Sequence, residues 1–335
     1  MDIIFILLIV VVILALFFDY TNGFHDAANA IATVVSTRVL TPGFAVALAA
    51  IFNLVGALIS VEVATTVGKG LVNPKLLDIL TMLAIVIGAI IWNLITWYFG
   101  LPTSSSHALI GAIMGGAIAH YDFSVVNYST LISKVFLPSI FAPILGIIGG
   151  IIFLFISYLI ASKMKAYLVN RLFRYLQLFS SSFMALSHGA NDAQKTMGLI
   201  SMALVAAGVY KEFTVPLWVK LAAAVSIALG TMVGGWRIIK TMGMRLTKLR
   251  PVDGFSAETS AATTIMLASH FGMPISTTYV ITSSIMGVGV AKKLNAIKWS
   301  LAFTILTAWF FTIPASATLS FFIYKLLSLF FKIQY

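Results

Sequence analysis

The sequence contains no cysteine, and charged residues make up only 9% of its 335 positions. The missing thiols exclude a disulfide framework, a thiolate metal site and a cysteine nucleophile. Soluble domains carry about 25% charged residues, and the mean hydropathy of +1.05 is too high for a water-soluble surface. The composition therefore excludes a soluble enzyme, a disordered chain and a nucleic-acid-binding protein.

Long stretches without charge predict an all-α polytopic membrane protein. Residues 79–121 and 135–162 contain no Asp, Glu, Lys or Arg, and one spanning helix needs about 20 apolar residues. The first stretch is interrupted by LPTSSS (101–106), and the stretch 259–291 is interrupted by GMPISTT (272–278). Interrupted apolar segments in matching positions of two halves are typical of transporters. We expect roughly ten to twelve helical elements, including broken helices and re-entrant hairpins.

Basic residues exceed acidic ones, 21 to 10, and they gather in a few segments. Residues 162–175 carry four Lys or Arg and residues 237–250 carry five, with no acid in either segment. The positive-inside rule places such loops in the cytoplasm. We interpret the excess of basic residues as a mark of cytoplasmic loops rather than as a binding site for an acidic partner.

Two short patterns occur twice, in the same order. GFHDA (23–27) matches GANDA (189–193) 166 residues later, and FGLPTSSS (99–106) matches FGMPISTT (271–278) 172 residues later. Nearly equal spacings of two patterns indicate an internal duplication.

The duplication predicts three parts: an N-terminal repeat at 1–161, a basic cytoplasmic linker at 162–177 and a C-terminal repeat at 178–335. Together the repeats form one transport domain. An odd number of crossings in each half would invert one repeat relative to the other, as is common in secondary transporters.

The first repeated pattern supplies oxygen ligands at membrane depth. The oxygen-bearing side chains are Asn22, Asp26 and Asn29 in one half, and Asn191, Asp192 and Gln194 in the other. A carboxylate in hydrocarbon needs a partner or a watery cavity, and hard cations prefer oxygen ligands. We therefore predict cation sites, with helix breaks at Gly23 and Gly189 that free backbone carbonyls. The alternative is simple ion pairing, for which Lys195 lies three residues after Asp192.

The second repeated pattern predicts an anion site. We expect Pro102 and Pro274 in the first turn of a helix, where the missing N–H is no loss. Hydroxyls and free N–H groups at a helix N-terminus bind anions. The side chains concerned are Thr103, Ser104, Ser105, Ser106, Ser276, Thr277 and Thr278. Two such ends meeting near the midplane would hold a tetrahedral oxyanion; the alternative is that the hydroxyls only cap and bridge helices.

The motifs resemble those of the inorganic phosphate transporter (PiT) family. GFHDAANAIAT (23–33) and SHGANDAQKTMG (187–198) resemble its paired signatures, and the two Pro-Ser/Thr segments resemble its hairpins. The resemblance covers nearly the whole chain and implies a non-enzymatic phosphate symporter with inverted repeats, coupling to sodium and a homodimer in the plasma membrane. The family also carries an acid where Glu258 stands, either a cation ligand or a helix-start residue. Lys195 departs from the family pattern, because it occupies the position that matches Asn29.

Charge gives a physical reason for symport. Phosphate is mostly divalent near neutral pH, and like charges in a low-dielectric cavity repel by several kcal/mol per close pair. Bound cations remove that repulsion. We therefore expect import of phosphate by alternating access, with no cofactor. Sodium is assigned to Asn22, Asp26, Asn29, Asn191, Asp192 and Glu258, and phosphate to the hydroxyls at 103–106 and 276–278 with Gln194.

Three alternatives to a sodium symporter stay open from the sequence. Coupling to protons or carriage of a metal–phosphate complex would use the same carboxylates. Sulfate is a tetrahedral anion of similar size, so a sulfate transporter is possible. An anion channel could use the half-helix ends without paired carboxylates. A membrane-embedded hydrolase is disfavoured, because no spacing of Ser and His singles out a catalytic constellation.

Overall fold

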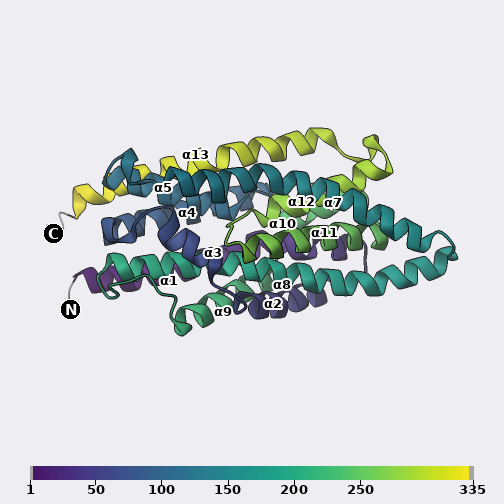
Figure 1. Ribbon diagram of the computed structural model, residues 1–335, viewed down its shortest axis with the longest axis horizontal. Coiled ribbons are helices and arrows are strands. Elements are labelled where there is room, and N and C mark those ends of the chain that lie inside the picture. The colour runs from purple at the N-terminus through teal and green to yellow at the C-terminus, as the bar shows by residue number, and fades with distance from the viewer. Residues whose placement is uncertain (1–2, 332–335) are drawn as a thin grey trace.

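The computed structural model describes residues 3–331, in which the regular structure is helical apart from an isolated bridge between Val72 and Val126 (Figure 1). The first half forms α1 (Ile3–Ser36), α2 (Pro42–Ala57), α3 (Glu62–Thr65), α4 (Ile79–Phe99), α5 (Ser105–His120), α6 (Tyr128–Thr130) and α7 (Leu137–Ala161). The second half forms α8 (Ala166–Ala206), α9 (Leu217–Val233), α10 (Trp236–Lys240), α11 (Pro251–His270), α12 (Thr277–Lys292) and α13 (Trp299–Phe330). The predicted all-α class is confirmed.

Several helices are long and apolar enough to cross a membrane. Four stretches qualify alone: α1, α4, the stretch Tyr128–Ala161 and α13. The number rises to six if two bent pairs each form one span. One pair joins α2 to Glu62–Gly70 at 66°, and the other joins α9 to Trp236–Arg245 at 60°. The bends follow α1 and α8 in the same order, so broken spans occur in matching places of the two halves.

The helices that carry the repeated aspartates do not break, which corrects one prediction. Helix α1 continues through Asp19 and Gly23 to Ser36, and α8 continues through Gly189. The glycines instead allow close packing. A Cβ atom on Gly23 would lie 2.4 Å from the Ile227 carbonyl oxygen, and one on Gly189 would lie 2.1 Å from that of Asn53. Neighbouring helices therefore touch backbone to backbone beside each aspartate.

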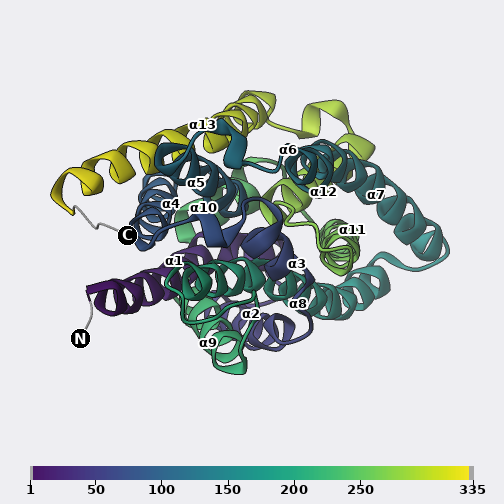
Figure 2. The same ribbon diagram turned by 60° about the vertical axis from the view of Figure 1, so that its left-hand side comes forward.

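The two halves interlock through matching pairs of helices. Helix α1 packs on α9 as α8 packs on α2, and α7 packs on α12 as α13 packs on α5 (Figure 2). In Figure 1, α1 starts at the end where α8 finishes, so the two run in opposite senses, as an inverted repeat requires. The division into repeats stays a prediction. Within the predicted linker, residues 162–165 form the turn, and the rest belongs to α8.

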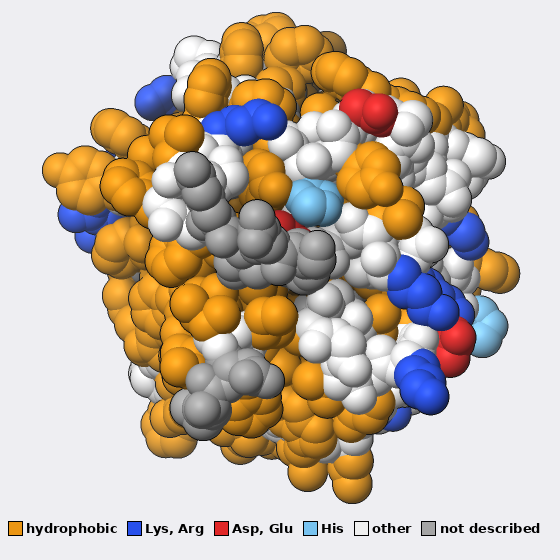
Figure 3. All heavy atoms as spheres, turned by 90° about the vertical axis from the view of Figure 1, so that its left-hand side faces the viewer, with side chains coloured by type: hydrophobic (Ala, Val, Ile, Leu, Met, Phe, Trp, Pro, Cys, Tyr) orange, Lys and Arg blue, Asp and Glu red, His pale blue; other side chains and the backbone are white. Residues whose placement is uncertain are grey.

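The outer surface is apolar in the way a lipid-facing surface must be. On α7, Ile140, Ile144, Ile148 and Ile152 are 45–59% exposed and recur every four residues, which places them on one face. Ala142, Gly146 and Gly150 lie on the opposite, buried face, towards α12. Figure 3 shows hydrophobic side chains over much of one end of the molecule, with charged side chains in small groups. The polar side chains of the two repeated patterns are therefore expected in the interior of the molecule.

Candidate functional site

Two chain breaks place hydroxyl groups at the starts of buried helices. Between α4 and α5, Gly100 takes φ +67°, and between α11 and α12, Gly272 takes φ +63°, a conformation that glycine adopts without strain. Both predicted prolines lie inside the breaks, three residues before α5 and α12 begin, and not in the first helical turn. The hairpin shape is thus as predicted, while the helix starts are later than predicted.

The first hydroxyl of each helix start is used as a cap. Ser104 accepts a hydrogen bond from the His107 amide at 3.1 Å, and Ser276 accepts one from the Tyr279 amide at 3.2 Å. The sequence analysis gave helix capping as the alternative role of the hydroxyls, and Ser104 and Ser276 are helix caps. The hydroxyls that follow are buried; Ser105, Thr277 and Thr278 donate to the aspartates, whereas Ser106 donates to the Ile275 carbonyl.

The Asp26 carboxylate lies among side chains from α1 itself and from the first turns of α5 and α12. Its Oδ1 lies 2.7 Å from His25 Nδ1 and 3.4 Å from the Thr278 hydroxyl, and its Oδ2 accepts from the Ser105 hydroxyl at 2.6 Å. Asn22 Oδ1 also lies 2.6 Å from the Ser105 hydroxyl. Asp26 is 2% exposed. The predicted cation ligands Asn22 and Asp26 are therefore in direct contact with the predicted phosphate ligand Ser105.

The Asp192 carboxylate has a matching set of neighbours. Thr277 donates to Asp192 Oδ2 at 3.3 Å, His188 Nε2 lies 3.2 Å from the same oxygen, and Lys195 Nζ forms an ion pair with Oδ1. The possible ion pair seen in the sequence is confirmed. Asp192 is 0% exposed, so the water that normally screens such charges is absent.

The hydrogen-bond chain behind His188 determines which ring nitrogen carries a proton. Thr231 donates to the Ile227 carbonyl and accepts from the Asn53 amide, which leaves Asn53 Oδ1 as the acceptor for His188 Nδ1 at 3.1 Å. A neutral ring then presents the lone pair of Nε2 to the Asp192 carboxylate. A proton or a metal ion between these two atoms removes the repulsion.

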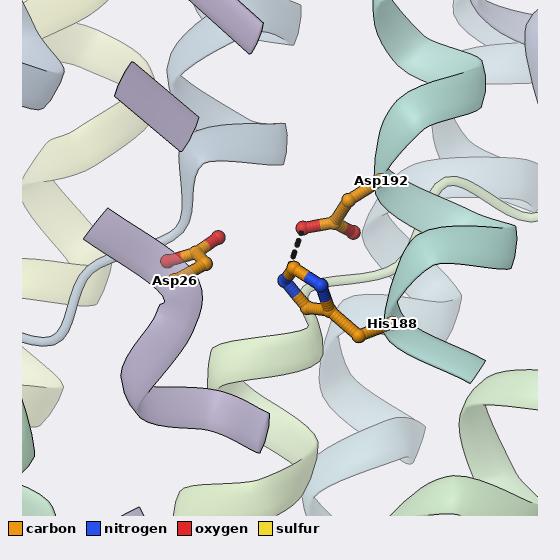
Figure 4. A group of neighbouring side chains, drawn as sticks. All are labelled: Asp26, His188 and Asp192. Atoms are coloured by element: carbon orange, nitrogen blue, oxygen red, sulfur yellow. Dashed lines mark ion pairs between the residues drawn. The ribbon is translucent and has the colours of Figure 1, made fainter. Parts of the chain in front are cut away.

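The two aspartates face each other across the halves. Ligand atoms of Asp26, His188 and Asp192 all lie within 4.8 Å of one another, and Figure 4 shows the carboxylates turned towards the same space between α1 and α8. Each hairpin also forms a hydrogen bond with the aspartate-bearing helix of the other half. Asn29, on α1, donates to Thr278 at 2.9 Å, and Lys195, in the matching position of α8, donates to Ser106. One buried centre therefore contains both repeated patterns.

Two predicted amide ligands, Asn29 in this centre and Asn191 next to Asp192 in the chain, keep an unused side-chain oxygen. Asn29 uses its amide nitrogen on Thr277 and Thr278, and Asn191 uses its own on Ser269 and the Met273 carbonyl. The side-chain oxygen of each is buried and has no hydrogen-bond partner among residues 3–331. A buried acceptor without a donor is costly, and such an amide oxygen is a ligand type that hard cations accept.

Gln194 and Thr103 lie apart from this hydroxyl cluster. Gln194 Oε1 accepts from the backbone amides of Val63 and Ala64 at 2.8 and 3.2 Å, and Nε2 donates to Ser60 and the Ala190 carbonyl. The Gln194 amide therefore binds the start of α3 and the neighbouring backbone rather than the hydroxyl cluster. Thr103 is buried within the hairpin break, with its hydroxyl 3.5 Å from His25 Nε2.

Glu258 belongs to a second polar cluster. Its carboxylate accepts from Thr33 at 2.5 Å, from Gln177 at 2.9 Å and from Ser180, so it joins α11 to α1 and α8. None of these partners belongs to the Asp26 and Asp192 centre. The sequence analysis missed these three residues, although Gln177 and Ser180 share one helix face at i, i+3 spacing, which was a usable signal.

The fold and the buried centre define a class: a polytopic membrane protein with half-helix ends and carboxylates in one closed site, the architecture of a secondary transporter. A model of the phosphate transporter family matches residues 22–320, and the chain belongs to that family. The chain is 45% identical to a probable low-affinity inorganic phosphate transporter of Bacillus subtilis over 99% of this chain and 100% of the relative. A similarly described Rhizobium meliloti protein is 45% identical over 94% and 95%.

A solved structure supports the same assignment. The structure described as the sodium-dependent phosphate transporter superposes with a TM-score of 0.87 at 25% identity, covering 97% of this chain and 100% of that one. The family and these relatives are transporters, so the prediction that the chain is not an enzyme is confirmed.

Proposed function

We propose that this chain imports inorganic phosphate across the plasma membrane by symport with a cation, with sodium as the first candidate. The observation that carries the proposal is the single buried centre, where the hydroxyls of two helix starts donate to two carboxylates beside the unpartnered amide oxygen of Asn29. Helix N-termini favour the anion, and the carboxylate and amide oxygens favour the cation.

The proposed assignment follows the contacts. Phosphate binds at the hydroxyls of Ser105, Ser106, Thr277 and Thr278, with the backbone amides of the two helix starts. Cations bind beside Asp26, Asn22 and Asn29 in one half and beside Asp192 and Asn191 in the other, with a further cation at Glu258. Each cation neutralises a carboxylate that would otherwise repel phosphate across a low-dielectric site. Binding of anion and cation is therefore mutually reinforcing.

Alternating access follows from the burial of the centre. Ser105, Thr278 and Asp192 are each 0–1% exposed, so phosphate enters only when a hairpin moves. The two hairpins occupy matching places in interlocked halves, and we assign one to each side of the membrane as a gate. The resemblance adds a homodimer as the assembled form.

One observation favours a second mode of coupling. Asp26, His188 and Asp192 offer one nitrogen and two carboxylates within 4.8 Å, a set suited to a proton or a divalent metal ion as well as to sodium. A metal–phosphate complex would use this set directly.

Radiolabelled phosphate uptake into proteoliposomes tests these proposals. Uptake is compared with an inward sodium gradient, with a proton gradient, with added magnesium and with none of these, and with sulfate as competitor. Accumulation above the outside phosphate concentration under an ion gradient is expected. Uptake that only equilibrates phosphate indicates a channel, and equal inhibition by sulfate at equal concentration refutes phosphate selectivity.

A further inference from the structure

Lys195 is the one Lys or Arg side chain that is buried among residues 3–331; it is 1% exposed. Every other described Lys or Arg side chain is at least partly exposed. A buried ammonium far from water is expensive unless it is paired and hydrogen-bonded. The positive-inside rule, which explains basic residues in loops, therefore does not explain Lys195.

The Lys195 ammonium is surrounded by oxygen acceptors from three elements. Its Nζ contacts an Asp192 carboxylate oxygen, the Ser106 hydroxyl and, at 3.3 Å, the Ile275 carbonyl. Ser106 gives its own proton to the Ile275 carbonyl at 3.1 Å, so its lone pairs face Nζ. An ammonium has three N–H donors, one for each of these oxygens.

This oxygen set is the one that a hard metal cation takes. A carboxylate, a hydroxyl and a backbone carbonyl are typical ligands of such ions. Here the positive charge among these oxygens is the Lys195 ammonium, which belongs to a side chain three residues after Asp192. The ammonium occupies the Oδ1 side of the Asp192 carboxylate, the position that an ion bound to these three oxygens would take.

The matching position in the first half is different. Asn29 stands three residues after Asp26, donates its amide hydrogens to Thr277 and Thr278, and keeps an unpartnered oxygen. Among residues 3–331 no Lys or Arg side chain is buried beside it, and the ionisable nitrogen in contact with Asp26 is His25 Nδ1 at 2.7 Å. The Asp26 side therefore keeps an unpartnered amide oxygen, that of Asn29, while the Asp192 side contains the Lys195 ammonium.

We propose that the Lys195 ammonium is a built-in cation that replaces an exchangeable coupling ion at Asp192. The coupling cation of the repeated pair then binds at Asp26 alone, which narrows the assignment under Proposed function. The inference rests on that proposed function, in that the site concerned is the proposed cation and phosphate centre. It predicts that removal of the charge turns the Asp192 side into a second ion site.

The test compares four purified variants by sodium binding, without phosphate. Lys195→Asn restores the amide of the first half, Lys195→Gln offers a longer amide, and Lys195→Met offers no ligand. Lys292→Asn is the matched control, since Lys292 also pairs with an aspartate, Asp253 at 2.7 Å, but outside the centre. Thermal melting is followed from zero to high sodium, with choline chloride keeping ionic strength constant, and size-exclusion profiles confirm that each variant is folded.

A ligand that binds only the folded state raises Tm with its concentration, and a second site steepens the dependence. Lys195→Asn and Lys195→Gln should melt below the wild type without sodium, and their Tm should rise with sodium more steeply than that of the wild type, which has the Asp26 site alone. Lys195→Met should melt low and keep the single-site sodium dependence of the wild type, and Lys292→Asn should follow the wild type in both respects. Amide variants with the sodium dependence of the wild type, or of Lys195→Met, overturn the proposal.

The uptake assay separates this inference from the proposed function. In proteoliposomes the amide variants should need more sodium ions per phosphate than the wild type, seen as a Hill coefficient for sodium higher by about one. If the wild type takes up no phosphate, the proposed function fails whatever the melting curves show. If uptake is normal and the amide variants gain no sodium site, only the role of Lys195 is refuted.

Discussion

Replacing Asp26 by asparagine removes the charge at the proposed cation site and keeps the shape of the side chain. Asp26 is 2% exposed and holds Ser105 at 2.6 Å, so water does little to screen it. At an effective dielectric constant of about 20, a carboxylate and a cation about 4 Å apart attract by about 4 kcal/mol. Since about 1.4 kcal/mol changes a Kd tenfold, we expect Asp26→Asn to weaken cation binding roughly a thousandfold.

The assay is initial phosphate uptake into proteoliposomes as a function of the coupling ion. We expect cation-dependent uptake to vanish at ion concentrations that saturate the wild type. The matched control is Asp78→Asn, because Asp78 caps α4 through the Thr81 amide at 2.7 Å, away from the centre. Asparagine caps a helix about as well as aspartate, so that variant should keep both its fold and its ion dependence. Wild-type uptake with unaltered ion dependence in Asp26→Asn would refute the coupling role.

Three further changes test the rest of the site and its packing. Ser105→Ala removes a hydroxyl from the anion site, and a hydrogen bond to a charged group is worth about 1.5–3 kcal/mol; the KM for phosphate should rise roughly tenfold or more. Gly189→Ala places a Cβ atom 2.1 Å from the Asn53 carbonyl oxygen, and should lower the free energy of unfolding by about 3 kcal/mol, measured by denaturation in detergent. Glu258→Gln sets an amide against three donors and should cost about 1–3 kcal/mol as well as weaken the sodium dependence of uptake.

Each of these changes has a control or a contrary outcome. An unchanged KM in Ser105→Ala places the anion elsewhere. Gly43→Ala is the control for packing, because a Cβ atom there meets nothing within 4 Å, and equal loss in both glycine variants contradicts the close-packing argument. Glu258→Gln with normal sodium dependence leaves Glu258 a structural role only.

Membrane class, helical fold and the two motifs were readable from the chain itself. Hydropathy is a local property, since about 20 apolar residues span a bilayer whatever they pack against. The hairpins were also local, because a Gly-x-Pro segment followed by hydroxyl residues ends one helix and starts another. The pairing of Lys195 with Asp192 needed only helical spacing, and the structure confirms it.

Packing decided what local patterns left open. Gly23 and Gly189 permit either a helix break or a close helix contact, and only the neighbouring backbones of Ile227 and Asn53 select the contact. Glu258 faces Thr33, Gln177 and Ser180 because α11 packs on α8 and touches α1, which no spacing within α11 reveals. Contacts between residues far apart in the chain depend on how whole helices are placed, and a short motif carries no record of that placement.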